Sequence, residues 1–351
     1  MTRTLEDRVL DVRLWLRAAR AVYDERARLT ASIAAGTGLS PQGVRLGFES
    51  LEVDATPDGL HALVASAGSA AHVHVILSAN VFVAPLRALA IARAAAPRVT
   101  VRPSSRDPTL TGALVAAAGD PAVSLAVDRD RIPAEADRID VYGRDETIAR
   151  VRGLARPGVA VRGHGAGLGV AFVARTTMVS LEGPADALAA DVIPFDQRGC
   201  LSPRIAFVEG PPQRGEAFAF ALHEALDRRG TAVPRGTLAK GERADAARWR
   251  ETLAFAGQVW LGDDHLVGLI ARPNLALRLV LPPAGRHVLV VPVESALEAR
   301  DLLAPIARFV VNVGLLDPDP ACVVVPPHAR VAPLGTMQRP PLDGPVDRRS
   351  L

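Results

Sequence analysis

The sequence has 351 residues, enough for two compact domains or for one large α/β unit with an inserted lobe. Hydrophobic residues make up 49% and charged residues 23% of the chain, a balance that excludes wholesale disorder. The formal net charge is +3 and the two signs are interspersed, which argues against a dedicated nucleic-acid-binding protein. The slight positive excess favours small anionic partners such as nucleotides.

Cysteine content and hydropathy predict the cellular setting. Two cysteines, Cys200 and Cys322, are too few for a disulfide scaffold, so we expect a reducing, cytoplasmic location. Glu6 and Asp7 interrupt the N-terminus where a secretion signal needs an unbroken apolar stretch. The most apolar long stretch, 79–96, contains a proline and arginines and cannot supply the roughly 20 apolar residues of a membrane span. We therefore expect a soluble protein.

The first part of the chain has helical patterns. Apolar residues recur at helical spacing from Leu5 to Tyr23, which predicts an amphipathic helix on the outside of a domain. A Ser-Pro pair at 40–41 predicts a second helix that runs to about Leu51. A third helix is expected at 58–67.

From residue 72 the pattern becomes an alternation of strands and helices. The predicted strands are HVHVILS at 72–78, RVTVR at 98–102, AVSLAV at 122–127, RIDVY at 138–142 and GVAVR at 158–162. The predicted helices lie at 81–95, after Pro108 and at 145–154. This alternation predicts an α/β fold with a doubly wound, parallel, Rossmann-like sheet. Ligands of such sheets bind at the carboxyl ends of the strands.

A second α/β lobe is expected from residue 169. Its predicted helices lie at 184–190, 215–228 and 243–256, and its strands at 170–174, 267–271, 275–281, 287–293 and 307–313. The predicted domains are residues 1–168, a nucleotide-binding domain with N-terminal helices; 169–316, a catalytic lobe that contains Cys200; and 317–351, an extended, proline-rich C-terminal segment.

The two cysteines have different surroundings. Cys200 lies in GCLSP, between a glycine and a Ser-Pro turn, so its thiol is expected on a loop where it can react as a nucleophile. A small buried hydrophobic residue is the alternative. Cys322 lies in the apolar run ACVVVPP and is expected in a core.

Polar or small residues follow three predicted strands at the edge where ligands bind. Asn80 could donate to a developing oxyanion, or it could cap the next helix. Arg102 and Ser104 offer a cation and a hydroxyl to a ribose or phosphate, or they form a solvated turn. Gly143 could let a pyrophosphate approach a helix N-terminus, or it could simply form a turn.

The histidines of the predicted first lobe offer an acid–base candidate but no metal site. His164 lies in the glycine-rich stretch 163–169, whose spacing does not fit a dinucleotide fingerprint. We interpret the stretch as a flexible hinge, with His164 as a catalytic acid or base or as a surface histidine. His72 and His74 alternate on one strand, but without nearby cysteine or acidic ligands they predict no metal site.

Several of these segments together resemble aldehyde dehydrogenases, in particular the acyl-CoA reductase (fatty acid reductase) branch known from bacterial luminescence. The stretches ILSANVFVAPLRALAIARAAAPRVTVRPSSRDP and RIDVYGRDETIARVR resemble the cofactor domain of that superfamily. VIPFDQRGCLSPR is similar to the nucleophile segment of the branch, and VAPLGTMQRPPLDGP to its C-terminal stretch. The resemblance spans about residues 37–345.

This resemblance implies an aldehyde dehydrogenase-like fold and a reaction. The reaction would be the reduction of an acyl thioester, from coenzyme A or a similar carrier, to an aldehyde with NADPH or NADH. The implied roles are acyl-accepting nucleophile for Cys200, oxyanion donor for Asn80, contact to the adenosine ribose or its phosphate for Arg102 with Ser104, and contact to the pyrophosphate for Gly143.

The segment VAVRGHGAGLG at 159–169 contains no acid, whereas oxidising aldehyde dehydrogenases place there the glutamate that activates water. Its absence favours thioester reduction over aldehyde oxidation. Two alternatives stay open: a cysteine acyltransferase or thioesterase that uses Cys200 and His164 without a nicotinamide cofactor, and a catalytically silent member that serves as a binding partner. No nucleic-acid partner is expected, and a homo-oligomer remains open.

Overall fold

The computed structural model describes residues 3–53, 55–128, 131–175, 180–270, 280–316 and 325–349. The chain divides into two compact units. Unit 1 consists of Met1–Thr37, Val44–Ala166 and Pro341–Leu351, and unit 2 of Gly38–Gly43 and Gly167–Pro340. The last residues of the chain therefore belong to unit 1. The predicted domain boundaries at 168 and 316 stay predictions. Cys322 and most of the predicted strand 275–281 lie outside the described residues.

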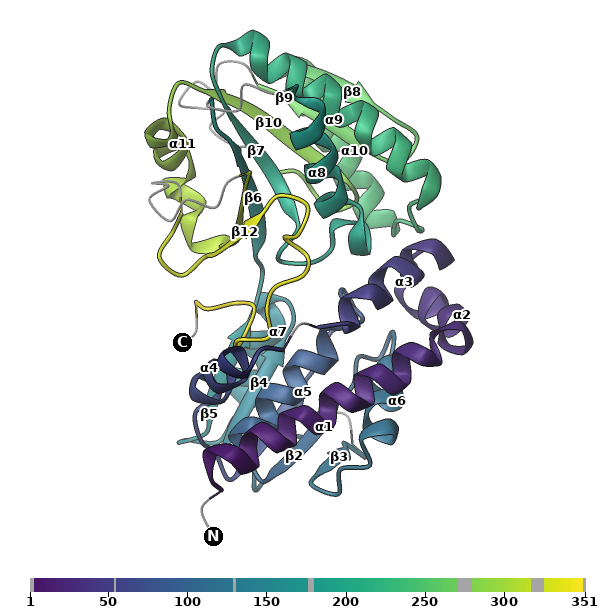
Figure 1. Ribbon diagram of the computed structural model, residues 1–351, viewed down its shortest axis with the longest axis vertical. Helices are drawn as coiled ribbons and strands as arrows, with labels where there is room; N and C mark the ends of the chain where they lie inside the picture. Colours follow the sequence, from purple (N-terminus) through teal and green to yellow (C-terminus); the bar gives the residue numbers. More distant parts are fainter. Residues whose placement is uncertain are drawn as a thin grey trace. The chain divides into compact units, whose positions relative to one another are not determined.

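Unit 1 contains a five-stranded, wholly parallel sheet with the strand order β3-β2-β1-β4-β5 (Figure 1). The strands are β1 (His72–Ile76), β2 (Arg98–Arg102), β3 (Val123–Leu125), β4 (Arg138–Tyr142) and β5 (Ala160–His164). The chain proceeds outward from β1 to β3 and then crosses to β4 on the other side of β1. The strand order thus reverses between β1 and β4, which makes this the switch point where ligands of doubly wound sheets bind.

The helices of unit 1 cover both faces of this sheet (Figure 1). They are α1 (Leu5–Asp24), α2 (Arg26–Thr37), α4 (Pro57–Ala67), α5 (Ala84–Ala95), α6 (Thr109–Ala118) and α7 (Asp145–Leu154), with the short 3-10 helix η1 (Glu49–Leu51). Helix α3 (Pro41–Phe48) begins in unit 2 and continues into unit 1. Helix α1 begins with a capping box between Thr4 and Asp7 and packs against α5 and α6. On the other face, Ile148 and Val151 of α7 pack against the β4 residues Ile139 and Val141. The predicted doubly wound α/β fold is confirmed.

Unit 2 contains a seven-stranded sheet with the order β12-β11-β6-β7-β10-β9-β8. Its strands are β6 (Leu168–Val173), β7 (Pro203–Glu209), β8 (Gln258–Leu261), β9 (Leu266–Leu269), β10 (His287–Val293), β11 (Val310–Leu315) and β12 (Arg330–Pro333). All neighbours are parallel except β8 and β9, which are antiparallel. Every residue of β6 and β10 is buried, as expected for central parallel strands covered on both faces.

Helices pack around the sheet of unit 2 (Figure 1). They are α8 (Glu182–Val192), α9 (Pro212–Ala232), α10 (Lys240–Ala256) and α11 (Ala296–Leu303), with the short 3-10 helices η2 (Pro194–Gln197) and η3 (Ala304–Phe309). The predicted helices 215–228 and 243–256 lie within α9 and α10. The core combines Leu168, Phe172, Ile205, Phe207 and Leu289 of the sheet with residues of the surrounding helices.

Several predictions were wrong in their extent, and two of them lie near predicted site residues. Helix α5 begins at Ala84 rather than at residue 81, because Pro85 occupies its first turn and leaves 77–83 as a loop. The glycine-rich stretch 163–169 is not a hinge throughout, since β5 extends to His164 and β6 begins at Leu168.

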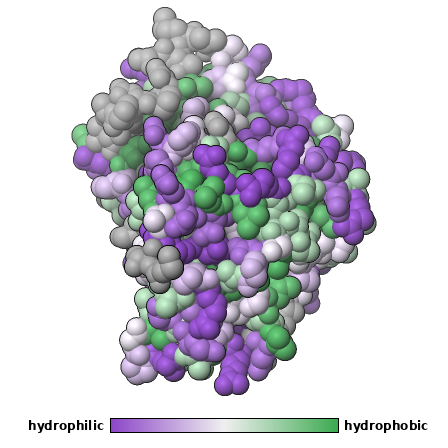
Figure 2. Space-filling view, turned by 60° about the horizontal axis from the view of Figure 1, so that its bottom comes forward, coloured by the Kyte–Doolittle hydropathy of each residue, from purple (hydrophilic) through white to green (hydrophobic). Residues whose placement is uncertain are grey.

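The surface mixes polar and apolar side chains. On the face shown in Figure 2, hydrophilic residues are interspersed with smaller groups of hydrophobic ones. Exposed large hydrophobic residues such as Leu10, Leu154, Phe220 and Phe255 are far apart in the sequence. Within the described ranges, every helix is too short or too polar to cross a membrane.

Candidate active site

Four predicted site residues lie at the carboxyl end of the unit 1 sheet. Arg102 and His164 are the last residues of β2 and β5, while Asn80 and Gly143 lie in the loops after β1 and β4. The register pairs Ile76 with Arg102 and Tyr142 with His164. Because the four strands are neighbours in the order β2-β1-β4-β5, these residues lie along one edge, on both sides of the switch point.

The side chain of Asn80 is held by an arginine that the sequence analysis missed. Arg106 donates from Nη2 to Oδ1 of Asn80 at 3.1 Å. A guanidinium only donates, so this contact identifies the carbonyl end of the amide and leaves the NH₂ end as a donor. Val83, not Asn80, precedes helix α5, and it makes no side-chain capping bond. The structure therefore does not support the helix-cap alternative for Asn80.

Ser104 belongs to the same group of contacts. Its Oγ accepts the backbone N–H of Arg106 at 3.2 Å, which shapes the bend after β2. We refer to Asn80, Ser104 and Arg106 as the strand-end cluster.

Arg102 lies two residues before Ser104 and is half-buried. Burial, and secondarily the charge of Arg102, lower the pKa of His74 to about 4, so His74 is neutral at pH 7.

Gly143 connects β4 to helix α7. Its N–H donates to the carbonyl of His164 at 3.2 Å. A Cβ added at Gly143 would come no closer than 3.7 Å to its nearest neighbours, which belong to Thr147, and the backbone is not in the left-handed region. Another residue could form the same turn, so the turn by itself does not explain why a glycine occupies position 143.

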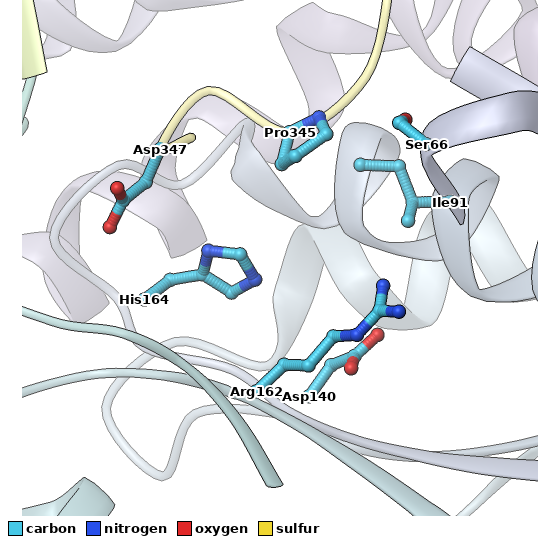
Figure 3. A pocket seen from close by; sticks show the side chains of 7 residues that line it. All are labelled: Ser66, Ile91, Asp140, Arg162, His164, Pro345 and Asp347. Carbon is cyan, nitrogen blue, oxygen red and sulfur yellow. The ribbon is translucent and has the colours of Figure 1, made fainter. Parts of the chain in front are cut away.

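His164 lies in a small pocket of unit 1 (Figure 3). Its ring stacks on Tyr142, with 4.4 Å between ring centroids and 14° between ring planes. The pocket is lined by Ser66, Ile91, Asp140, Arg162, His164, Pro345 and Asp347. These residues come from α4, α5, β4, β5 and the C-terminal segment. His164 is thus half-buried rather than a fully exposed surface histidine.

The charges in this pocket are paired. Arg138 donates twice to Asp140, at 2.9 Å and 2.7 Å. Burial raises the pKa of Asp347, but the hydrogen bonds and charge of Arg349 outweigh burial and leave that pKa below its usual value. Burial lowers the pKa of His164, and the carboxylates of Asp140 and Asp347 oppose this only in part. His164 is therefore a neutral imidazole at pH 7 that can accept a proton.

The C-terminal segment is attached to unit 1 by backbone carbonyls. Arg87 of α5 donates to the carbonyls of Pro341 at 2.9 Å and Gly344 at 2.7 Å. Arg349 donates to the carbonyl of Ala166 at 2.8 Å. These contacts bring Asp347 to the His164 pocket. The sequence analysis assigned no role to Asp347, although the C-terminal stretch that resembles the reductase branch ends only two residues before it.

In unit 2, Cys200 lies on the turn between η2 and β7 and is half-buried. The three residues Phe195, Asp196 and Gln197 have φ angles of 55°, 49° and 62°. None of them is glycine, so each occupies a left-handed conformation that costs about 1–3 kcal/mol. We refer to residues 195–200 as the nucleophile turn, after the role that the sequence resemblance implies for Cys200. Such strain persists only where the surrounding structure determines the conformation.

Buried side-chain contacts hold this turn. Arg286 donates to Oδ1 of Asp196 at 3.1 Å and 2.8 Å, and Gly236 donates its N–H to Oδ2 at 3.0 Å. Gln197 donates to the carbonyls of Pro203 and His287, both at 2.7 Å, and accepts the N–H of His287 at 2.8 Å. The left-handed backbone is therefore fixed by both side chains of the Asp-Gln pair.

The C-terminal part of unit 2 contacts residues on either side of the nucleophile turn. Gln338 donates to Oγ of Ser202 at 3.3 Å and to the carbonyl of Asp191 at 3.1 Å. The carboxylate of Asp191 accepts the N–H groups of Gly335 at 2.6 Å and Met337 at 2.8 Å. Burial raises the pKa of Asp191 to about 7, against these hydrogen bonds, which lower it. Two segments that carry the sequence resemblance thus meet in unit 2.

The structure groups the predicted site residues by unit. Unit 1 brings Asn80, Arg102, Ser104, Gly143 and His164 to one sheet edge, and unit 2 presents Cys200 on the strained turn.

Comparisons with known proteins agree with this architecture. Residues 64–338 match the family model described as acyl-CoA reductase (LuxC). No curated protein sequence matches the chain significantly. Among solved structures, an NAD-dependent aldehyde dehydrogenase from Sinorhizobium meliloti has a TM-score of 0.66 at 13% identity, over 92% of this chain and 74% of its own. An aldehyde dehydrogenase from Mycobacterium tuberculosis, complexed with NAD+, has a TM-score of 0.65 at 12% identity, over 92% and 77%. An NAD-dependent benzaldehyde dehydrogenase from Corynebacterium glutamicum has a TM-score of 0.63 at 16% identity, over 88% and 76%.

Proposed function

The chain belongs to the acyl-CoA reductase (LuxC) family of oxidoreductases, and from this we propose that it reduces an acyl thioester to an aldehyde through a thioester on Cys200, with NADPH or NADH as reductant. The Cys200 thiolate attacks the acyl carbonyl, the bond to the donor sulfur breaks, and the donor thiol leaves with a proton. A hydride and a proton then convert the bound acyl group into the aldehyde and restore the Cys200 thiol. The acyl donor is coenzyme A or a similar carrier.

The observation that carries this proposal is the nucleophile turn. Residues with a strained backbone that is held by many surrounding contacts are found mostly at active sites. Here Asp196 and Gln197 are buried and fully engaged, while the half-buried Cys200 follows them on the turn. The strain is therefore consistent with a fold that sets the position of one thiol. A cysteine that only fills a core would need no such backbone.

Asn80 is proposed to stabilise the oxyanion that forms when the acyl carbonyl is attacked. Its NH₂ group is the end left available by the Arg106 contact. A donor whose orientation is fixed in advance needs no reorganisation as charge develops. Arg106 is accordingly a positioning residue.

The residues of unit 1 fit a nicotinamide dinucleotide, which supplies the hydride when bound. The switch-point edge offers a cation, Arg102, and a hydroxyl, Ser104, for the ribose or its phosphate. Gly143 lies just before the N-terminus of α7, and its turn does not require a glycine. The absence of a side chain there would let a pyrophosphate approach the backbone N–H groups at the start of the helix. We therefore propose unit 1 as the nucleotide-binding domain and unit 2 as the catalytic lobe.

The fate of the acyl group distinguishes a reductase from a thioesterase. The segment 159–169 offers no carboxylate, and the acids beside His164 are paired with arginines. The neutral His164 is the one group of this segment that could activate water, so we propose slow hydrolysis and rapid reduction.

Intact-mass measurement after incubation with acyl-CoAs of different chain lengths tests the proposal. The wild type should gain the mass of one acyl group without nucleotide and lose it as aldehyde when NADPH or NADH is added. Cys200→Ala should gain none, whereas the matched control Cys322→Ala should behave like the wild type. Rapid release of free acid without nucleotide, lost in His164→Ala, would favour the thioesterase. Absence of labelling in every protein would favour the catalytically silent alternative.

A further inference from the structure

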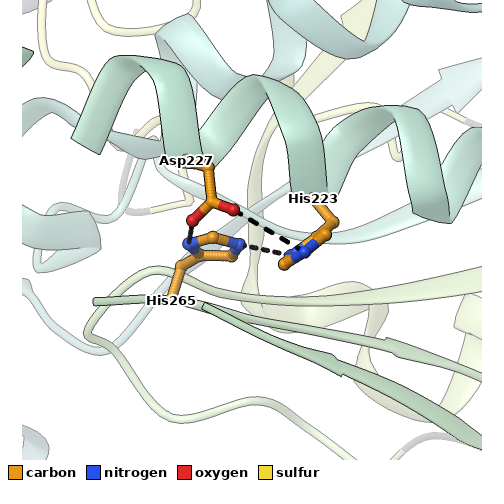
Figure 4. A group of neighbouring side chains, drawn as sticks. All are labelled: His223, Asp227 and His265. Atoms are coloured by element: carbon orange, nitrogen blue, oxygen red, sulfur yellow. Dashed lines mark hydrogen bonds and ion pairs between the residues drawn. The ribbon is translucent and has the colours of Figure 1, made fainter. Parts of the chain in front are cut away.

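A second group of chemically active side chains lies in unit 2, on helix α9 and on the turn between β8 and β9 (Figure 4). His223 and Asp227 are four residues apart on α9 and therefore share one face of the helix. His265 directly precedes β9 and points toward them. One ligand atom from each of the three residues lies within 4.8 Å of the other two.

The distances define how the three side chains meet. Nδ1 of His223 lies 2.9 Å from Nε2 of His265, which is a hydrogen bond between the two rings. The other ring nitrogens face the carboxylate of Asp227, with Nε2 of His223 at 3.7 Å and Nδ1 of His265 at 3.6 Å. These last two distances are too long for hydrogen bonds.

Counting protons shows what this arrangement lacks when both rings are neutral. Two neutral rings carry two protons, one of which is shared in the bond between them. If His223 donates that bond, the lone pair on its Nε2 faces Asp227. If His265 donates it, the lone pair on its Nδ1 faces the same carboxylate. Either tautomer directs a nitrogen lone pair at an anion, and an additional cation would remove the conflict.

His265 supplies independent evidence. Its side chain is fully buried, and within the part of the chain that the structure describes its Nδ1 has no hydrogen-bond partner. A second carboxylate, that of Asp264, lies 3.8 Å from this nitrogen. A buried polar atom without a hydrogen-bond partner lowers the stability of the fold. Nδ1 of His265 is therefore expected to bind a group that the protein itself does not supply.

The glycine at position 262 lets the backbone pass close to two of the three side chains. A Cβ at Gly262 would overlap the ring of His265 and would lie 2.7 Å from Oδ1 of Asp227. A side chain at this position would therefore displace one or both groups. The carboxylate of Asp227 is 48% exposed, which gives an ion a route from solvent to the buried His265.

We propose that His223, Asp227 and His265 form a binding site for a divalent transition-metal ion of the zinc class. Two imidazoles and one carboxylate are ligands typical of Zn²⁺ and unlike the all-oxygen sets of Mg²⁺ and Ca²⁺. Bonds of about 2.0–2.1 Å in a tetrahedral site separate ligand atoms by about 3.3 Å, close to the present N···O distances. Binding opens the hydrogen bond between the two histidines, and water completes the coordination.

This site goes beyond the proposed acyl reduction and does not depend on it. An ion held by α9 and by the turn before β9 would fasten the helix to the edge of the sheet in unit 2. The expected role is therefore structural, and its readouts are metal affinity and thermal stability rather than turnover.

Calorimetric titration of metal-free protein with Zn²⁺ tests the site. All titrations use the Cys200→Ser, Cys322→Ser background, because thiolates also bind Zn²⁺. We expect one equivalent to bind, a rise in melting temperature with Zn²⁺ concentration, and intense absorption bands of tetrahedral Co²⁺ when Co²⁺ replaces Zn²⁺. Asp227→Asn, at an exposed position where folding should survive, should weaken binding at least about 10-fold, as should His223→Asn.

Two further variants separate the site from incidental binding. Gly262→Ala keeps all three ligands, but its added Cβ would displace the His265 ring, so it should also weaken Zn²⁺ binding. His61→Asn removes an exposed histidine of unit 1 and should change nothing. Circular dichroism confirms that each variant is folded. Absence of binding at micromolar Zn²⁺, or binding that is equal in His61→Asn, His223→Asn and Asp227→Asn, would overturn the proposal.

Discussion

The nucleophile turn of unit 2 and the strand-end cluster of unit 1 each hold a side chain with a proposed catalytic role, but with different means. Before Cys200, two buried side chains and an arginine fix three left-handed residues through short hydrogen bonds. Around Asn80, a 3.1 Å contact from Arg106 orients an exposed amide. The turn is thus complete within the protein, whereas the cluster is open to solvent.

This contrast suggests a division of labour. A covalent nucleophile has to be in position for every acyl donor, so a rigid, strained turn is an advantage. An edge that is proposed to exchange nucleotides has to stay open to solvent, so its side chains contribute less to the stability of the fold. The same type of substitution should therefore have different consequences in the two regions.

The largest expected effect is on stability in the nucleophile turn. Arg286→Met leaves the buried carboxylate of Asp196 without its ion-pair partner, which typically destabilises a protein by about 3–5 kcal/mol. Arg106→Met, the same change at the exposed strand-end cluster, should alter the free energy of unfolding by less than about 1 kcal/mol. Urea denaturation of both variants measures the difference. Similar losses in the two proteins would contradict the comparison.

The next effect concerns turnover rather than stability. Asn80→Ala removes the proposed oxyanion donor and should lower the rate of acyl transfer by about 100- to 1,000-fold. Because Asn80 is exposed and does not cap α5, the melting temperature should hardly change. Single-turnover acylation with an acyl-CoA, monitored by mass, gives the rate. Retained activity with reduced stability would assign Asn80 a structural role.

A smaller effect is expected on nucleotide preference. If Arg102 contacts a 2′-phosphate, its charge-assisted hydrogen bonds have no equivalent with NADH. Arg102→Ala should then weaken NADPH binding by about 10-fold or more and leave NADH binding nearly unchanged. Titration of both nucleotides into both proteins compares the four affinities. Equal losses for the two nucleotides would show that Arg102 does not read the phosphate.

The sequence predicted the parallel sheet of unit 1 because its signals are local. Runs such as RVTVR and RIDVY are short and rich in β-branched residues, and helical patterns separate them, so each element could be recognised alone. Helix α2 was missed because its apolar residues form only a weak stripe. The three left-handed residues gave little signal either, since Phe195 and Gln197 are not usual turn residues and Asp196 is the one such residue among them.

The remaining site features depend on contacts between distant residues. Arg286 lies 90 residues from Asp196, and Arg349 lies 183 residues from Ala166. No spacing rule connects such pairs. The hydrogen bonds from Arg286 to the nucleophile turn and the position of Asp347 could therefore not be predicted. The cluster of His223, Asp227 and His265 is similar: two members share a helix, but the third joins them only through the fold.

The smallest expected effect concerns the His164 pocket, which belongs to unit 1 like the strand-end cluster but is lined by two buried carboxylates, Asp140 and Asp347. Asp347→Asn removes a negative charge that raises the pKa of His164 against the larger effect of burial. The pKa of His164 should therefore fall further below its usual value. NMR titration of the imidazole protons, assigned with His164→Gln, measures this shift. Asp343→Asn changes a carboxylate of the same segment that pairs with Arg348 and should leave the titration unchanged.

The sign of the accompanying stability change follows from proton binding. Because the pKa of His164 is lowered in the folded protein, the unfolded chain binds more protons once the pH falls to about 6.5, the usual value for histidine. His164 therefore costs stability as the pH decreases through that value, and it should cost more in Asp347→Asn. Urea denaturation at about pH 7 and pH 5.5, with His164→Gln as reference, measures the difference. An unchanged or higher His164 pKa in Asp347→Asn would mean that the C-terminal segment does not act electrostatically on this pocket.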